Sequence, residues 1–250
     1  MVKISGSSHE TTGRILDTAE RLFMEHGYDG ASMRMLTSAA AVNLAAINYY
    51  FGSKEGLLQA VFKRRLDWLN KERLRVLDEL EGKAGGKPLR PPQILEAFFG
   101  TLLTMGERPE LGGIVFLRLI GRSLTEPAPF IREFFADEYQ SVVARYRQAF
   151  YRSMPDLASE EIAWRFQFML GAISYAIAGT DSLRILGGTK PIEESDAVHA
   201  RHLRERLMPF LLAGLQAPTP KLSAGDPVGK QKAAPLPPGV RIITHSSNSR

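Results

Sequence analysis

A short stretch near the N-terminus combines small side chains with a polar group at a spacing that suits contact with DNA bases. Leu44, Ala45 and Ala46 would let the start of a helix approach another surface closely. Asn48 carries an amide that can pair with N6 and N7 of adenine, and Leu44 or Ala45 can touch a thymine methyl group. The residues expected to meet base edges are therefore Leu44, Ala45, Ala46, Asn48 and Tyr49.

A second set of side chains around this stretch carries hydrogen-bond donors. Ser32, Arg34, Tyr50 and Lys54 have hydroxyl, guanidinium or ammonium groups that suit phosphate oxygens. Contacts of this kind position a protein on a duplex without reading its sequence. We therefore expect these four residues to contact the DNA backbone.

Local signals predict the elements that must position these side chains. Ser32, Asn43 and Ser53 are good N-cap residues, and each precedes a helical pattern. Only residues 41–43 separate the first two helices, so the second must leave at a steep angle. Ile47 would then face the core. This is the layout of a helix-turn-helix, whose second helix enters the major groove, although an ordinary α-hairpin with surface tyrosines has the same pattern.

Residues 14–66 resemble the N-terminal domain of TetR-type transcription regulators, and the run YYFGSKEGL at residues 49–57 is similar to their signature. The resemblance implies a three-helix DNA-binding head, a helical ligand-sensing body and a homodimer. Residues 43–49 further resemble a subgroup that responds to fatty acids or acyl-CoA. Ala41 stands where the family usually has Gly, and Asn48 where many members have Tyr. A left-handed Ala41 would cost about 1 kcal/mol relative to Gly.

Composition excludes several classes of function. The 250 residues include no cysteine, which rules out disulfides and thiolate chemistry. The net charge of +5 arises mainly in residues 217–250, which hold five basic residues and one acid. DNA affinity must therefore come from locally placed cations. The most apolar stretch, residues 162–179, contains Arg165 and Gln167 and indicates a buried helix, not a membrane span. We expect a soluble cytoplasmic protein.

The helical patterns predict an all-α chain of four parts, with no convincing strand. Residues 1–10 form a flexible arm, residues 11–66 the helix-turn-helix domain and residues 67–216 the ligand-binding and dimerisation domain. Residues 217–250 are a disordered tail rich in Pro, Gly, Ser and Ala. The first helix would start at Thr11 or Thr12. A long helix from Ser53 to about Leu80 would be the only covalent link between head and body.

The apolar run of residues 114–120 is interrupted by Arg118, which must be paired if it is buried. Its partner could be Glu133 or Glu161, or else Arg118 and Arg122 could receive the carboxylate or phosphate of a ligand. The residues that would line an apolar pocket around it, each of which could instead be plain core, are Phe98, Phe99, Leu102, Phe116, Phe134, Phe135, Trp164 and Phe168.

Small residues at 171–179, together with Leu203, Leu207, Phe210 and Leu211, suggest a four-helix dimer interface. A two-fold dimer would place its recognition helices about 34–36 Å apart, or at a longer spacing on the same DNA face. His199 and His202 lie near Glu194 but lack a third strong metal ligand, and no catalytic or cofactor-binding motif is present.

The sequence thus predicts a dimeric, ligand-responsive regulator without enzyme activity, metal or cofactor. A repressor is favoured, released from a palindromic operator by a small effector of acyl or fatty-acid type. The alternative is a helical small-molecule-binding or partner-binding module without a DNA role.

Overall fold

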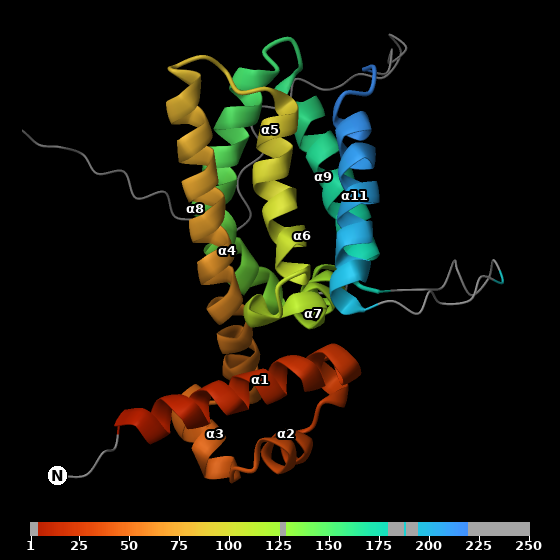
Figure 1. The fold of residues 1–250 in the computed structure, drawn as a ribbon. Helices are drawn as coiled ribbons and strands as arrows, with labels where there is room; N and C mark the ends of the chain where they lie inside the picture. Colours follow the sequence, from red (N-terminus) through yellow and green to blue (C-terminus); the bar gives the residue numbers. More distant parts are fainter. Residues whose placement is uncertain (1–4, 126–128, 180–187, 189–194, 220–250) are drawn as a thin grey trace, which may run out of the picture. The chain divides into compact units, whose positions relative to one another are not determined.

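The computed structural model describes residues 5–125, 129–179, 188 and 195–219 of the chain (Figure 1). Every regular element in these ranges is a helix, so the prediction of an all-α fold is confirmed. None of the helices in the described ranges is long and apolar enough to cross a membrane. Residues 1–217 form one compact unit. The predicted tail lies outside the described part of the chain from residue 220 onward.

The head consists of α1 (Ser5–Gly30), α2 (Met33–Ala40) and α3 (Leu44–Phe51). Helix α1 begins at Ser5, so the prediction of a start at Thr11 or Thr12, and of an arm up to residue 10, is wrong from Ser5 onward. Once the packed part of α1 is formed, each further residue adds a hydrogen bond, and the polar residues before Thr11 continue the helix. Gly27, with φ 71°, interrupts the helical geometry within α1.

Helix α4 (Lys54–Ala84) connects the head to the body, as predicted, and ends at the left-handed Gly85. Its buried residues include Leu57, Phe62, Leu66 and Leu77. The remaining elements, seen in Figure 1, are α5 (Pro91–Leu95), the π-helical η1 (Glu96–Gly100), α6 (Thr101–Gly106), the 3₁₀ turn η2 (Pro109–Leu111), α7 (Gly113–Thr125), α8 (Pro129–Ser153), α9 (Ser159–Ile177) and α11 (Asp196–Leu215).

Helix α7 is central to the body, as its apolar sequence predicts. It packs against α9, α6 and α11 of the body and against α1 of the head. Gly121 allows α7 and α9 to approach closely, because a Cβ at this position would lie 2.6 Å from the backbone nitrogen of Ala178. Ala178, one of the small residues predicted for a dimer interface, thus packs within the chain, whereas a Cβ at Gly171 would meet nothing within 4 Å.

Candidate nucleic-acid interface

The turn between α2 and α3 is closed by local hydrogen bonds. The Ser32 hydroxyl accepts from the Met35 backbone N–H at 3.2 Å, and Asn43 Oδ1 accepts from that of Ala46 at 2.8 Å. Ala41 is left-handed, with φ 50° and ψ 48°, and it is the one non-glycine residue with positive φ in the described ranges. The predicted caps Ser32 and Asn43 are thus confirmed, and Ala41 adopts the left-handed conformation for which a cost was expected.

Helix α3 turns one face inward and one outward. Ile47 is fully buried and Phe51 half-buried, which fixes the helix on the core of the head. Four of the five predicted base-contacting residues are exposed, with 84% of Tyr49 and 49% of Leu44 accessible; the set is Leu44, Ala45, Asn48 and Tyr49. Ala46 is half-buried. Figure 1 shows α2 and α3 on the side of α1 that faces away from the body helices.

The predicted phosphate contacts lie around this face. Ser32 and Arg34 are exposed at the start of α2. Tyr50 packs edge-on against Tyr49, with 5.1 Å between the ring centroids. The ammonium of Lys54 lies 4.5 Å from the centroid of the Tyr28 ring, which limits its position. The set therefore provides donors on both α2 and the start of α4.

Sequence reasoning missed two residues that support the interface. Arg14 Nε of α1 donates to the carbonyl oxygen of Ala40 at 3.1 Å and so ties α1 to the end of α2. Tyr28 carries the ring beneath Lys54. Each contact joins residues that are 26 positions apart, so the local spacing within residues 32–54 contains no signal for it.

A three-helix head with a short turn and an exposed, small-residue second helix, joined to a helical body, defines a helix-turn-helix DNA-binding protein. Sequence models of one family match both parts of the chain. Residues 15–61 match "Bacterial regulatory proteins, tetR family", and residues 96–214 match "Tetracyclin repressor-like, C-terminal domain". The chain belongs to the TetR family, which consists of transcription regulators and not of enzymes.

Similarity to curated relatives is confined to the head. The HTH-type transcriptional repressor AcnR of Corynebacterium glutamicum is 47% identical over 47 residues, which are 19% of this chain and 25% of the relative. UidR of Escherichia coli, an HTH-type transcriptional regulator, is 33% identical over 61 residues, or 24% of this chain and 31% of the relative. The chain thus matches about a quarter to a third of these relatives' length.

Solved structures with a similar chain path include a regulator from Rhodococcus, at a TM-score of 0.49 and 18% identity, with 81% of this chain and 96% of that one covered. A mutant of HlyIIR has a TM-score of 0.46 at 16% identity, with 82% and 97% covered. The family assignment does not depend on these likenesses.

A buried carboxylate joins the head to the body. Glu20 of α1 is 3% exposed and accepts from Arg64 Nη2 at 2.7 Å and from Arg65 Nη2 at 2.8 Å, both on α4. Arg65 Nη1 also donates to the Glu110 carbonyl oxygen in η2 at 3.1 Å. In the basic run of residues 63–65, Lys63 is exposed, whereas Arg64 and Arg65 are half-buried against Glu20.

The predicted ligand-lining residues do not surround one cavity. Phe98, Phe99, Leu102, Phe116 and Phe135 are buried in the core, and Phe134 packs against Phe62. Trp164 and Phe168 pair with each other on the surface, 57% and 65% exposed. Helical periodicity predicts an apolar face but not which neighbouring helix covers it. Some of the predicted lining residues are therefore buried in the core and others are exposed.

Arg118 and Arg122 also lie elsewhere than predicted. Arg118 is half-buried, and a Cβ added at Gly179 would lie 3.1 Å from its Nε. Its proposed partner Glu161 instead accepts from Arg165 Nε at 2.7 Å, and Glu133 is exposed. Arg122 is exposed and donates to the Met24 carbonyl oxygen of the head. Arg118 lines none of the cavities described below.

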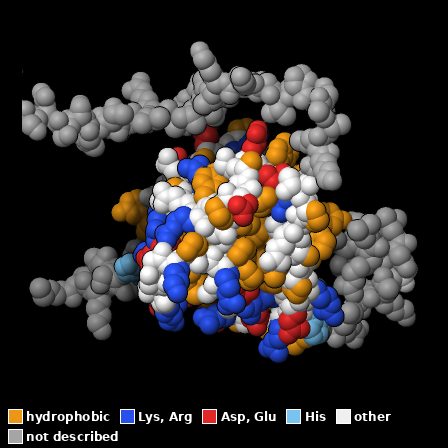
Figure 2. All heavy atoms as spheres, turned by 90° about the horizontal axis from the view of Figure 1, so that it is seen from above, with side chains coloured by type: hydrophobic (Ala, Val, Ile, Leu, Met, Phe, Trp, Pro, Cys, Tyr) orange, Lys and Arg blue, Asp and Glu red, His pale blue; other side chains and the backbone are white. Residues whose placement is uncertain are grey.

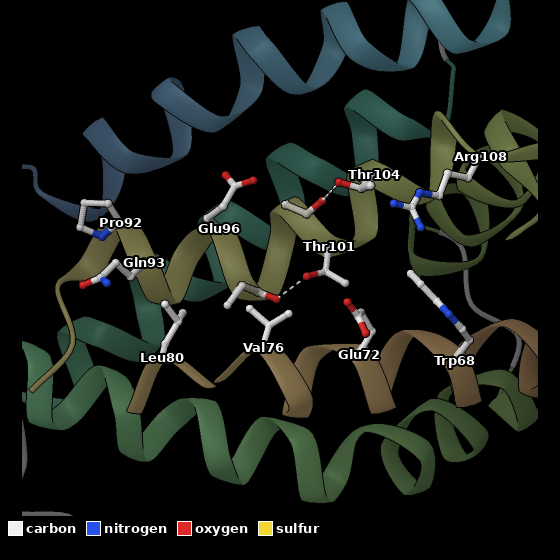
Figure 3. A pocket seen from close by; sticks show the side chains of 12 residues that line it. Trp68, Glu72, Val76, Leu80, Pro92, Gln93, Glu96, Thr101, Thr104 and Arg108 are labelled. Atoms are coloured by element: carbon white, nitrogen blue, oxygen red, sulfur yellow. Dashed lines mark hydrogen bonds between the residues drawn. The ribbon is translucent and has the colours of Figure 1, made fainter. Parts of the chain in front are cut away.

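The body does contain cavities. The larger, of about 450 Å³, lies between α4 and the α5–α6 segment (Figure 3). Thr101 and Thr104 on its wall donate back to the carbonyl oxygens of Ala97 and Gly100. Glu72 is held by Arg75 at 2.6 and 2.7 Å, and this hydrogen bonding lowers the pKa of Glu72. Thr101, Thr104 and Glu72 on the cavity wall therefore have hydrogen-bond partners within the chain. A smaller cavity, of about 170 Å³, lies between α8 and α9.

Proposed function

We propose that this chain is a transcriptional repressor that binds a palindromic operator as a homodimer and leaves it when a small effector binds to the body. The observation that carries the proposal is the exposed face of α3. A capped helix with a small-residue start presents Leu44, Ala45, Asn48 and Tyr49 outward, and its inner face is fixed by Ile47. An α-helix of this kind fits the major groove.

In this proposal the Asn48 amide reads adenine, and Leu44 and Ala45 contact thymine methyl groups. The small side chain of Ala46 lets the helix approach the bases closely, and Tyr49 also contacts base edges. Ser32, Arg34, Tyr50 and Lys54 contact phosphates and fix the register of the helix in the groove. The site of action is the bacterial cytoplasm, where the operator DNA is found.

The dimer would form through the outer faces of α9 and α11. Hydrophobic side chains reach the surface in several places on the face shown in Figure 2. On α9 and α11 the large ones are Trp164, Phe168, Tyr175 and Phe210, all at least 45% exposed. Of the residues first suggested for the interface, Leu207 and Leu211 are buried within the chain, whereas Phe210 is available. A stripe of exposed aromatics favours an interface between copies.

Effector binding between body helices would act on the heads through α4. This helix carries Arg64 and Arg65, which hold Glu20 of α1, so a shift of α4 changes the position of the head. The effector must bind the DNA-incompetent state more tightly, since only differential affinity shifts the equilibrium. An acyl or fatty-acid-like effector suits the apolar cavities of the body.

The test is a fluorescence-anisotropy titration of the duplex upstream of the chain's own gene against a scrambled duplex of the same length. We expect at least about 1000-fold preference for the former, and affinity that falls steeply with salt. Equal, weak affinity for both duplexes would contradict the proposal. It would favour the alternative, a helical small-molecule-binding or partner-binding module without a DNA role.

A further inference from the structure

Arg73 of α4 is a buried cation in the interior of the body. The residue is 2% exposed, and its guanidinium carbon lies 4.0 Å from the centroid of the Phe98 ring. Its Nε donates to the Phe98 carbonyl oxygen at 2.9 Å. Its Nη1 is fully buried and has no hydrogen-bond acceptor among the described residues. The guanidinium is thus only partly satisfied by the protein.

In the part of the chain that the structure describes, no carboxylate forms an ion pair with this guanidinium. The groups that act on it are the hydroxyls of Tyr139 and Tyr146, and burial lowers the pKa of Arg73. Asn70, one turn earlier on α4, donates to the Glu138 carbonyl oxygen at 3.0 Å, while its buried Oδ1 has no donor in the described ranges. An unpaired buried charge is strongly destabilising. A buried group of this kind beside a cavity is a candidate for ligand binding.

Arg165 shows how the same body treats a buried arginine with a structural role. It is 6% exposed, and its Nε pairs with Glu161 at 2.7 Å. Its Nη1 donates to the Leu215 carbonyl oxygen at 2.6 Å. Arg165 thus has a carboxylate and a C-terminal helix carbonyl as partners. Arg73 bonds the Phe98 carbonyl oxygen but pairs with no carboxylate of the described ranges, although it is more deeply buried.

The smaller cavity approaches Arg73 through Tyr146, which is one of its lining residues. Its walls between α8 and α9 are mostly apolar, with Val143, Tyr146, Phe150, Ile162 and Phe166, and Arg147 and Gln167 also line it. Tyr146 belongs to both places, because its hydroxyl donates to the Arg73 carbonyl oxygen at 2.7 Å and its ring lies 4.9 Å from that of Phe98. A ligand that reaches from the cavity to the guanidinium would have to displace the Tyr146 ring.

We propose that the body binds an amphiphilic anion, with its carboxylate or phosphate on Arg73 and its apolar chain in the cavity between α8 and α9. Arg73 would supply a charge-assisted hydrogen bond from Nη1, and Asn70 Oδ1 would accept from any hydroxyl of the headgroup. This proposal deepens the proposed function, on which it rests for the role of the ligand as effector. Binding would act on α4, the helix that also holds Glu20.

The first experiment measures thermal unfolding of the full chain with three probes that share a ten-carbon tail: decanoate, decyl phosphate and decanol. We expect at least one of the two anions to raise Tm by about 5 °C or more near saturation, and the neutral alcohol to have little effect. The stronger anion identifies the headgroup. No shift with either anion, or an equal shift with decanol, would overturn the proposal.

The second experiment repeats the melts with Arg73→Gln and with the control Arg132→Gln, an exposed arginine of α8. The shift caused by the anion should disappear in Arg73→Gln and persist in the control. An undiminished shift in Arg73→Gln would overturn the role of Arg73.

A third measurement does not depend on whether Arg73→Gln folds. A photoreactive decanoate bound to the wild-type chain should label peptides from α8 and α9 that line the cavity, and labelling confined to other helices would overturn the placement. These assays need no DNA, so their failure is distinct from failure of operator binding. Binding of the anion without release of the operator would leave the site in place and refute its effector role.

Discussion

The recognition face of α3 and the interior around Arg73 place polar groups in opposite settings. Asn48 and Tyr49 are exposed, on a helix fixed by contacts between residues three or four apart. Arg73 of α4 is covered by residues of η1 and α8 that are distant in sequence. A surface that reads DNA must be preformed and accessible, whereas an interior that senses a ligand holds a charge that the protein alone does not satisfy.

The largest effect should come from separating the two copies while both regions stay intact. Phe168→Asp with Phe210→Asp puts charges on the exposed apolar face of α9 and α11. We expect a monomer by sedimentation velocity and about 100-fold or greater loss of operator affinity, since two linked heads bind far more tightly than one. Ala136→Asp on α8 is the control. A dimer that survives the double substitution would place the interface elsewhere.

Breaking the joint between the two regions should have the next largest effect. Glu20→Gln leaves two guanidinium groups without their shared carboxylate, and we expect the free energy of unfolding to fall by about 3–5 kcal/mol. Urea unfolding measures this loss. Asp17, whose side chain is 68% exposed, also pairs with Arg64. Asp17→Asn should cost less than about 1 kcal/mol, and equal costs would show that burial of Glu20 is unimportant.

A smaller effect concerns the turn that sets the angle of α3. Ala41→Gly should raise the free energy of unfolding by up to about 1 kcal/mol, because Gly adopts the left-handed conformation without strain. Ala39→Gly, at an exposed helical position of α2, should lower it by about 0.5–1 kcal/mol. Thermal unfolding of the two variants should therefore shift in opposite directions; destabilisation by both would contradict strain at Ala41.

The smallest effect should be seen at a single phosphate contact. Lys54→Met should reduce the slope of log affinity against log salt by about 0.9 for each protomer, with the preference among DNA sequences unchanged. Lys71→Met, at an exposed position of α4, should leave the slope as it is. Equal slopes for Lys54→Met and the wild type would remove Lys54 from the interface.

The same contrast explains what could be predicted from the sequence. The caps Ser32, Asn43 and Ser53 act on backbone groups three residues away, so local spacing is sufficient to predict them. The elements of the head and most helices of the body followed from such patterns. Glu20 is paired with residues 44 and 45 positions away, and no local pattern indicates such a pair.

The sequence pattern indicates Arg118 as the buried arginine of the body, whereas the more deeply buried one is Arg73. Arg118 lies in the most apolar run, yet that run does not determine how deeply one side chain is covered. Arg73 is in helical register with Leu66, Leu69 and Leu77, all fully buried, and this register was the available signal. Its unsatisfied Nη1 could be recognised only from the neighbours that η1 and α8 provide.

The central claim is that the exposed face of α3 reads the operator. Asn48→Ala with Tyr49→Ala should reduce affinity for the operator by about 100-fold or more, with dimerisation and thermal stability unchanged. Gln140→Ala with Gln148→Ala, at exposed positions of α8, is the control. Anisotropy titrations that give both double variants the affinity of the wild type would contradict the account.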